Sequence, residues 1–347
     1  MAFSKFDYQM MTKAIRFAKK GKYTASPNPI VGCVITKNKK IISYGYHKKA
    51  GAPHAEVNAI NNANQNIENS TMYITLEPCS HYGRTPPCAD AIVTAGIKKV
   101  IIATLDPNPK VTGLGVDILK NANIKVKTGL LANKAQSLNK GFFKRMVSKR
   151  PYITCKIAMS LDGKIALSSG ESKWITSKYS RLDVQKLRAR SDAILAGVHT
   201  VIYDNPNLTV RDIKAKAPIR VILDTKNKTK GKNLNIFSNN AKTLIFNNKN
   251  TKTDLNNGKL DLKDVVTKLA KLEINNVLLE TGPKLAGSML KKGLIDEFII
   301  YIAPILMGSS SKSMLDIKID KMLDKINLDI KNIQMIANDI KITALPR

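Results

Sequence analysis

The feature that most constrains the fold is a regular alternation of apolar, strand-like runs with helix-like segments. Apolar runs around the polar residues 37–39 predict a hairpin, and strands and helices then alternate toward residue 147. Because strands that alternate with helices build a layered sheet, this order indicates an α/β fold. In this first half we expect strands at 30–36, 40–46, 72–76, 99–105 and 124–126, and helices at 5–20, 54 onward, 86–95 and 132–146.

The alternation is interrupted once, at Ser148-Lys149-Arg150-Pro151, and then begins again with a strand. A chain of 347 residues is long enough for two domains at about 150 residues each. We therefore expect domains over 1–147 and 151–347, with loops around one strand in 225–260 and only closing strands after 310. The second domain is expected to hold strands at 152–158, 192–197, 219–224, 242–246, 276–280 and 297–302, and helices at 178–190, 261–272 and 283–291.

The charge is strongly positive, with 57 Lys and Arg against 26 Asp and Glu, a formal net charge of +31. One interpretation is a binder of nucleic acid or of an anionic membrane. The other is codon bias, because the Lys excess accompanies many Asn and Ile, as an AT-rich genome produces. Aromatic residues are only 5%, too few for the stacking platform of a single-strand binder. We favour codon bias and expect no specific nucleic acid partner.

Targeting signals and cysteine usage give a consistent expectation. The chain begins without an apolar signal segment, and no apolar run reaches the roughly 18 residues of a membrane-spanning helix. Four cysteines over this length do not form a disulfide scaffold. We expect a cytoplasmic protein without a membrane partner, in which closely spaced cysteines indicate a metal. Cys33 and Cys155 lie in apolar strand runs and are expected in the core.

Three residues of the first half form a candidate zinc site. His54 opens a predicted helix, Cys79 follows a predicted strand, and Cys88 follows a Pro-Pro pair that opens another helix. One imidazole and two thiolates leave a fourth zinc position open, as hydrolytic sites do, and zinc lowers the pKa of a bound water to about 7. Glu56 cannot share the direction of His54 on a helix, so we expect it beside the open position as a proton shuttle.

The same residues resemble the cytidine-deaminase superfamily, in which His-Ala-Glu is joined by Pro-Cys and a second Cys. The usual short Pro-Cys-x-x-Cys is replaced here by eight residues between Cys79 and Cys88. The run 77–88 resembles the riboflavin-biosynthesis deaminases, as do 27–32, 45–51 and 106–115. The resemblance implies a three-layer α/β/α domain that hydrolyses the 2-amino group of a phosphorylated pyrimidine and binds one zinc.

The second half lacks a Gly-x-Gly-x-x-Gly motif but has a strand that runs into 281–288. A glycine turn followed by a helix start can bind an anion, although such a turn alone is a weak indication. The runs 156–166, 174–177, 187–200, 204–211 and 218–224 resemble the reductase half of the bifunctional riboflavin-biosynthesis deaminase/reductases. That resemblance implies a dihydrofolate-reductase-like domain that uses NADPH to reduce the ribosyl group to ribityl.

The resemblance also implies contact residues in the second half. Two arginines suit a ribose 5-phosphate, because guanidinium pairs bidentately with phosphate. The implied substrate contacts are Ser172, Arg188, Leu208, Arg211 and Glu280. The implied NADP contacts are Ala158, Trp174, Thr200, Asp204, Thr225, Gly282, Pro283, Lys284, Leu285, Ala286, Gly287 and Ser288.

Two other function classes compete with a bifunctional enzyme. A nucleic-acid-editing deaminase with a basic RNA-binding domain predicts the short Pro-Cys-x-x-Cys and aromatic or RGG-type features, and the sequence has neither. A non-catalytic, zinc-stabilised interaction protein needs no glutamate beside the metal, yet Glu56 is present. The sequence leaves open whether the protein is a homo-oligomer, which hydride face is used, and whether the intermediate is channelled.

Overall fold

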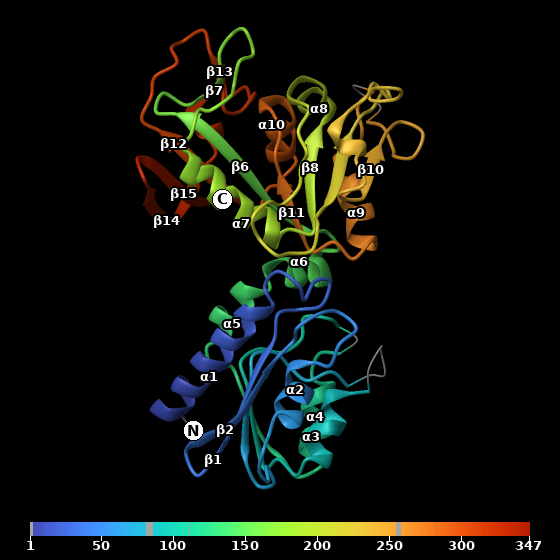
Figure 1. Cartoon of the computed structure of the whole chain (residues 1–347), viewed down its shortest axis with the longest axis vertical. Helices are drawn as coiled ribbons and strands as arrows, with labels where there is room; N and C mark the ends of the chain where they lie inside the picture. Colours follow the sequence, from blue (N-terminus) through green and yellow to red (C-terminus); the bar gives the residue numbers. More distant parts are fainter. Residues whose placement is uncertain (1–2, 81–85, 110, 255–257) are drawn as a thin grey trace. The chain divides into compact units, whose positions relative to one another are not determined.

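The structure is a computed structural model that describes residues 3–80, 86–109, 111–254 and 258–347 (Figure 1). The chain divides into two compact units, Met1–Lys149 and Arg150–Arg347. In the described part of the chain, no helix is long and apolar enough to span a membrane. Each unit has its own sheet and its own core, so the expected two-domain α/β fold is confirmed.

The first unit is built on a five-stranded sheet in the order β2-β1-β3-β4-β5. The β1–β2 hairpin and the β1–β3 pair are antiparallel, whereas β3, β4 and β5 run parallel. Its strands are β1 (Gly32–Lys37), β2 (Lys40–Tyr46), β3 (Thr71–Ile74), β4 (Lys99–Ile102) and β5 (Lys125–Thr128). Its helices are α1 (Lys5–Ala18), α2 (Ala55–Asn61), α3 (Cys88–Thr94), α4 (Leu114–Asn121), α5 (Ala132–Leu138) and α6 (Lys140–Ser148), with a 3₁₀ turn η1 (Lys19–Gly21).

Helices cover both faces of this sheet, which gives the expected three layers (Figure 1). Apolar side chains of α1 and α5 pack on one face, and those of α2, α3 and α4 pack on the other. Helix α1 begins as the sequence predicts, because the Ser4 hydroxyl accepts the Asp7 N–H while the Asp7 carboxylate accepts the Ser4 N–H. The layers leave the starts of α2 and α3 beside the end of β3, where the candidate zinc ligands lie.

The prediction of one helix over 132–146 is wrong in one respect, because this segment forms two helices, α5 and α6, separated at Asn139. The buried side chain of Asn139 accepts a hydrogen bond from the N–H of Ile30 at 2.7 Å and donates one to its carbonyl at 2.9 Å. Asn139 has a φ of −121°, which ends α5 before α6 begins. The strand predicted over 99–105 is also shorter, since β4 ends at Ile102.

The second unit contains an eight-stranded mixed sheet in the order β10-β9-β8-β11-β6-β12-β15-β14, beside a small β13–β7 pair. Its strands are β6 (Tyr152–Ser160), β7 (Lys164–Ala166), β8 (Ala193–Gly197), β9 (Ile219–Leu223), β10 (Thr243–Phe246), β11 (Asn276–Leu279), β12 (Glu297–Ala303), β13 (Lys312–Ser313), β14 (Leu328–Ile336) and β15 (Asp339–Pro346). Its helices are α7 (Lys178–Arg190), α8 (Val198–Asp204), α9 (Leu262–Lys271) and α10 (Pro283–Lys291), with 3₁₀ turns η2 (Asn235–Phe237) and η3 (Met322–Asp324).

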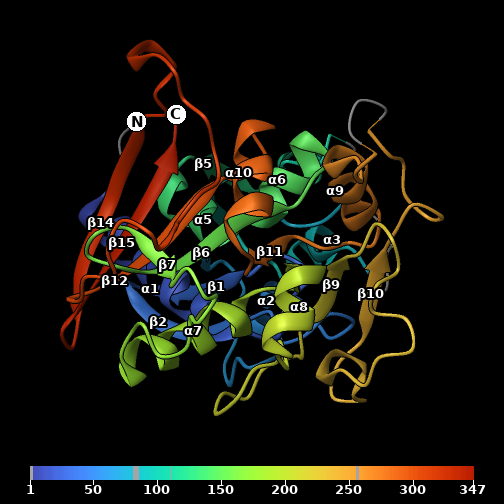
Figure 2. The same cartoon turned by 90° about the horizontal axis from the view of Figure 1, so that it is seen from above.

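Helices α9 and α10 cover one face of this sheet, and α7 and α8 cover the other (Figure 2). Cys155 is buried in the core of this unit and Cys33 in that of the first, as predicted. Helix α8 was not predicted, because its sequence Val-His-Thr-Val-Ile-Tyr-Asp is made of residues with modest helix propensity. It follows β8 directly and brings Thr200 and Asp204 to the carboxyl edge of the parallel strands, where α/β sheets bind ligands.

Candidate active sites

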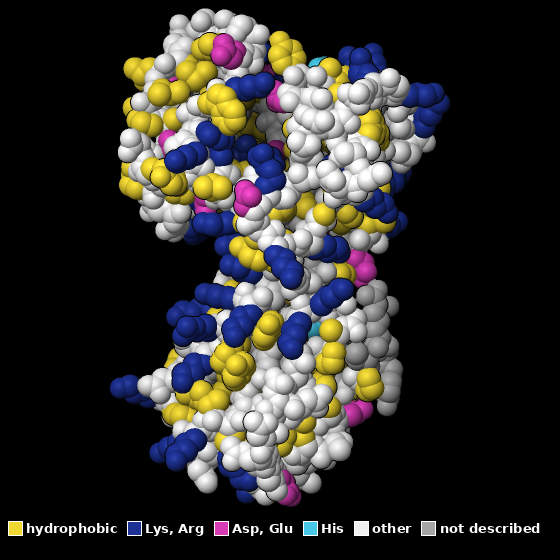
Figure 3. Space-filling view, in the orientation of Figure 1, with side chains coloured by type: hydrophobic (Ala, Val, Ile, Leu, Met, Phe, Trp, Pro, Cys, Tyr) yellow, Lys and Arg dark blue, Asp and Glu magenta, His cyan; other side chains and the backbone are white. Residues whose placement is uncertain are grey.

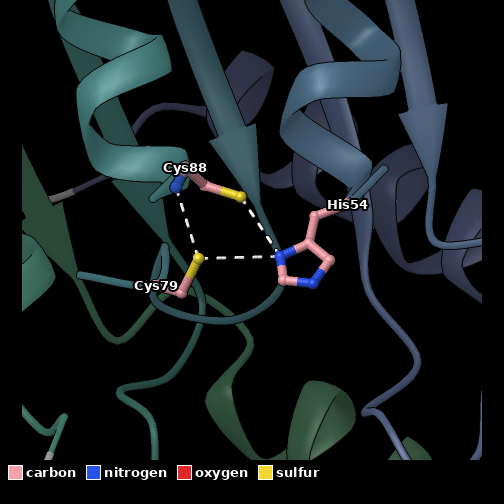
Figure 4. A group of neighbouring side chains, drawn as sticks. All are labelled: His54, Cys79 and Cys88. Atoms are coloured by element: carbon pink, nitrogen blue, oxygen red, sulfur yellow. Dashed lines mark hydrogen bonds between the residues drawn. The ribbon is translucent and has the colours of Figure 1, made fainter. Parts of the chain in front are cut away.

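The three predicted zinc ligands of the first unit lie together (Figure 4). His54 caps the start of α2, Cys88 is the first residue of α3, and Cys79 lies in the segment that follows β3. The ligand atoms all lie within 4.8 Å of one another. His81 and Arg84, which belong to the family-like run between the two cysteines, are outside the described residues.

The distances between the ligand atoms fit a zinc ion. The Nδ1 atom of His54 is 3.2 Å from Sγ of Cys88 and 3.6 Å from Sγ of Cys79. A tetrahedral zinc with Zn–S near 2.3 Å and Zn–N near 2.0 Å separates nitrogen from sulfur by about 3.5 Å. The three side chains therefore have the spacing that a zinc ion requires, with one position left for a non-protein ligand.

The charge pattern of the two cysteines also fits a divalent cation. A hydrogen bond with the Cys88 side chain, followed by those from His54 and the Cys88 N–H, lowers the pKa of Cys79 to about 4. That shared hydrogen bond and burial raise the pKa of Cys88. Two thiolates in contact repel each other, so both can be ionised only with a cation between them.

Glu56 lies in the first turn of α2 and is only 3% exposed. Burial raises the pKa of its carboxyl to about 7, against the opposing effect of the neighbouring His54. A carboxyl group with a pKa near neutrality can both take up and release a proton. The structure thus places an acid–base group next to the three ligands, two residues along the chain from His54.

The site also includes His47 and Asn28, which lie in the family-like runs 45–51 and 27–32 but received no predicted role. The His47 ring meets the His54 ring edge to face, with their centroids 5.1 Å apart. His47 is 2% exposed, and its nitrogens lie 3.2 Å from the Pro53 carbonyl and 3.2 Å from the Asn28 side-chain amide. These contacts fix the His47 ring, which in turn restricts the orientation of His54.

The second unit holds a cavity of about 490 Å³ at the carboxyl edge of its parallel strands, and the space-filling view shows a hollow there with charged side chains at its mouth (Figure 3). All five predicted substrate contacts line it. Six of the predicted NADP contacts also line it, namely Ala158, Trp174, Thr200, Asp204, Gly282 and Pro283. The volume is within the range of small-molecule and cofactor sites.

The charged centre of this cavity is a buried ion pair. The Nε and Nη2 atoms of Arg188 donate to the two carboxylate oxygens of Glu280 at 2.7 and 3.0 Å, and its Nη1 donates to the Thr209 carbonyl at 3.0 Å. Lys156 lies 3.5 Å from the same carboxylate. Although burial opposes ionisation, the charges of Arg188 and Lys156 lower the pKa of Glu280 to about 2. Arg188 is therefore neutralised by protein, whereas Arg211 is exposed at the cavity wall.

Six predicted NADP contacts are not among the described residues that line the cavity. Thr225 follows β9, and Lys284 to Ser288 continue along α10. Gly287 lies mid-helix, where a Cβ atom would come within 2.5 Å of the Asp316 carbonyl oxygen. The glycine allows the backbone of Asp316 to pack closely on α10, and NADP contact by Lys284 to Ser288 stays a prediction.

The lining side chains that sequence reasoning missed include Lys156, Arg181, His199 and Tyr203. Lys156 could have been found from its strand, because alternate residues of β6 point to opposite faces. His199 and Tyr203 lie on α8, which was itself not predicted. The Arg181 guanidinium lies 4.2 Å from the centroid of the Trp174 ring, a contact between α7 and the preceding loop that no sequence pattern indicates.

Comparison with known proteins assigns a family to each unit. Residues 4–104 match the family described as "Cytidine and deoxycytidylate deaminase zinc-binding region", and residues 151–342 match the family described as "RibD C-terminal domain". The riboflavin biosynthesis protein RibD of Escherichia coli strain K12 is 41% identical over 359 residues, covering 96% of this chain and 98% of that protein. RibD of Buchnera aphidicola is 42% identical over 369 residues, with 97% of each chain covered.

Solved structures agree over the same length. A structure of Acinetobacter baumannii RibD superposes with a TM-score of 0.93 at 41% identity and covers 99% of each chain. The Thermotoga maritima diaminohydroxyphosphoribosylaminopyrimidine deaminase/5-amino-6-(5-phosphoribosylamino)uracil reductase superposes with a TM-score of 0.89 at 34% identity, again over 99% of each chain. The likeness therefore extends through both units.

Proposed function

This chain belongs to the RibD family of bifunctional deaminase/reductases of riboflavin biosynthesis, and on that premise we propose which of its residues carry each activity. The enzyme is a zinc-dependent pyrimidine deaminase joined to an NADPH-dependent reductase. The observation that carries the assignment of residues is the group of His54, Cys79 and Cys88 with Glu56 beside it.

For deamination, His54, Cys79 and Cys88 hold the zinc, which when bound activates a water for attack on the ring carbon that bears the 2-amino group. Glu56 accepts the proton of that water on its carboxylate. It then delivers protons to the ring nitrogen and to the departing ammonia. Burial of Glu56 suits this role, because a pKa near 7 allows the same carboxyl to act first as base and then as acid.

The zinc assignment is tested by metal analysis of the purified chain. The wild type is expected to hold one zinc per chain, and Cys88→Ser is expected to lose it because a serine hydroxyl is a poor zinc ligand at neutral pH. Cys155→Ser provides the matched control, since this cysteine is buried in the core of the other unit. Full zinc retention in Cys88→Ser, or zinc loss in the control alone, contradicts the assignment.

For reduction, the cavity of the second unit takes NADPH and the deaminated substrate. NADPH supplies hydride to C1 of the ring-opened ribose, and the protein positions the two reacting carbons. We assign the substrate phosphate to Arg211, because Arg188 already donates to Glu280 and Thr209. We assign the ribose hydroxyls to the ionised Glu280 and the adjacent Lys156, which both line the cavity.

We also propose that the protein works as a homo-oligomer in the cytoplasm, where its zinc-binding thiols stay reduced. Strand β14 is the outer strand of its sheet, and a bulge between Ile330 and Asn332 places Leu328, Ile330, Ile333 and Met335 on one face. These side chains are 39–63% exposed. A second copy presents the same apolar face, so twofold pairing buries both. Ile333→Lys is expected to yield a smaller species in light scattering; an unchanged mass contradicts this interface.

A further inference from the structure

The loop over 167–174 joins β7 to the segment before α7 and carries two of the predicted ligand contacts that line the cavity, Ser172 and Trp174. Its first part is a tight turn, in which the Gly170 N–H donates to the Leu167 carbonyl at 2.9 Å and the Leu167 N–H donates to the Glu171 carbonyl at 2.8 Å. Because residues 167–169 and 171 are exposed, the position of this turn depends on what it contacts at the cavity mouth.

The tip of the turn contacts one side chain of α8. Gly170 has a φ of +96°, and a Cβ atom there would lie 3.1 Å from the Tyr203 Oη and 3.3 Å from two of its ring carbons. The Tyr203 ring therefore lies directly against the bare backbone of Gly170. The hydroxyl of Tyr203 is 3.4 Å from the Ser169 carbonyl oxygen, well beyond the usual separation of about 2.8 Å for O–H···O bonds. The ring edge and the hydroxyl thus both contact the turn, and the hydroxyl contributes only a long hydrogen bond.

The far end of the loop contacts the other side of the cavity. Trp174 has a φ of +66°, a conformation that costs free energy for a residue with a side chain. Its ring is 72% exposed and lies under the Arg181 guanidinium of α7. Between these two contacts, burial raises the pKa of the Asp204 carboxyl in α8, and the positive charge of Lys173 opposes this by favouring the ionised form. The loop is thus held between α7 and α8, with Tyr203 as its contact at the tip.

We propose that Tyr203 is a positioning residue for the reductase reaction, whose ring packs on Gly170 and holds the 167–174 loop so that Ser172 and Trp174 meet the substrate and NADPH. The inference rests on the proposed function of the cavity. It explains why an aromatic side chain that is 74% exposed lies on α8 one residue before Asp204. The contact also uses the bare backbone of Gly170, because a Cβ atom there would lie only 3.1–3.3 Å from Tyr203.

Trp174 allows a direct test, because it is the only tryptophan of the chain. Its fluorescence anisotropy reports the mobility of the loop, and its quenching by NADPH reports binding. In Tyr203→Ala we expect lower anisotropy and an NADPH Kd about tenfold higher, since binding must then order backbone that is already fixed in the wild type. Tyr203→Phe keeps the ring and is expected to stay within about twofold of wild type.

Controls separate positioning from general destabilisation. Tyr179→Ala removes an exposed tyrosine of α7 that is absent from the described cavity lining, and it is expected to leave both signals unchanged. Gly170→Ala is expected to weaken NADPH binding, and by a smaller factor when Tyr203 is already alanine, because the two changes remove the same contact. Ammonia release by the first unit serves as an internal check on each preparation.

The outcomes distinguish the inference from the function on which it rests. Unchanged anisotropy and NADPH affinity in Tyr203→Ala overturn the positioning role, and so does a Tyr203→Phe variant as impaired as Tyr203→Ala. Strictly additive effects of the Gly170 and Tyr203 changes contradict the contact as the cause. Independently, the KM for NADPH in Trp174→Ala tests the cavity itself: if this KM stays at the wild-type value, the proposed cofactor site is wrong.

Discussion

The two units use the same residue type, a buried glutamate, in opposite ways. Glu56 of the first unit is 3% exposed, and burial raises its pKa to about 7. Glu280 of the second unit is 8% exposed, yet Arg188 and Lys156 lower its pKa to about 2 against the same burial effect. The difference lies in the charged side chains beside each carboxyl. For Glu56 the effect of His54 is opposed by the Cys79 thiolate, whereas for Glu280 the charges of Arg188 and Lys156 both lower the pKa.

The two sites also differ in how they are assembled. The deaminase site takes its protein groups from two helix starts and the segment after one strand, and a metal demands specific residue types at fixed spacing. The reductase cavity collects side chains from β6, the 167–174 loop, α7, α8 and the end of β11. Such a cavity is specified by shape and by packing over long sequence distances, which short motifs encode poorly.

The largest effect is expected for the proton-carrying glutamate. Glu56→Gln keeps the size of the side chain but cannot accept a proton, so deamination should fall by about 10²- to 10⁴-fold. Zinc content and reduction of supplied deaminated substrate should remain at wild-type levels. Ammonia release measured beside NADPH oxidation checks both statements, and deamination within tenfold of wild type removes Glu56 from the proposed role.

The cation-surrounded glutamate is expected to control stability. Glu280→Gln leaves the buried guanidinium of Arg188 without its counter-charge, which typically costs about 3–5 kcal/mol. Urea unfolding of the full chain, followed by Trp174 fluorescence to report the second unit, measures the loss. Asp264→Asn breaks the more exposed Lys268–Asp264 pair and should cost at most about 1 kcal/mol. Equal losses in the two variants contradict the account.

The same pair predicts a pH dependence. Because the folded-state pKa of Glu280 is lowered from 4.5 to about 2, its contribution to stability is present above pH 4.5 and is lost as the pH falls toward 2. Glu280→Gln should abolish this part of the acid sensitivity. Unfolding midpoints of both proteins between pH 5 and pH 2 test it, and parallel curves contradict it.

A smaller effect distinguishes the two glycines of the predicted phosphate loop. Gly287→Ala brings a Cβ atom to within 2.5 Å of the Asp316 carbonyl oxygen and should destabilise the second unit by about 1–3 kcal/mol. A Cβ atom at Gly282 meets nothing within 4 Å, so Gly282→Ala should leave stability nearly unchanged. Thermal unfolding measures the stability of the two variants. A larger loss of stability in Gly282→Ala than in Gly287→Ala would contradict the close packing of Gly287.

The sequence predicted the order of most strands and helices because their apolar periodicity is strong. It failed where tertiary contacts decide, as at Asn139, whose side chain bonds Ile30 from more than a hundred residues away and divides a predicted helix. It also missed α8, whose residues favour a helix only weakly and which is stabilised by packing of Val201 in the core.

In the candidate sites, too, the sequence predicted what residue type and spacing determine and missed what tertiary contacts determine. The cluster of His54, Cys79 and Cys88 follows from residue type and spacing, and the structure brings these side chains together. The NADP contacts over 284–288 were implied by the family resemblance and stay a prediction, because these residues are not among the described cavity lining and Gly287 packs against Asp316. The contact between Tyr203 and Gly170 joins α8 to the 167–174 loop and leaves no local pattern in the sequence.

The central claim is that each unit performs one reaction with its own residues. Its most direct test measures both activities in a single preparation of Cys79→Ser, using ammonia release from the diaminopyrimidine phosphate and NADPH oxidation with supplied deaminated substrate. The account predicts that ammonia release is lost while NADPH oxidation stays within about twofold of wild type, because the two sites share no residues and independent sites do not couple. Loss of both activities in a protein that keeps its wild-type circular dichroism would contradict it and indicate one shared site.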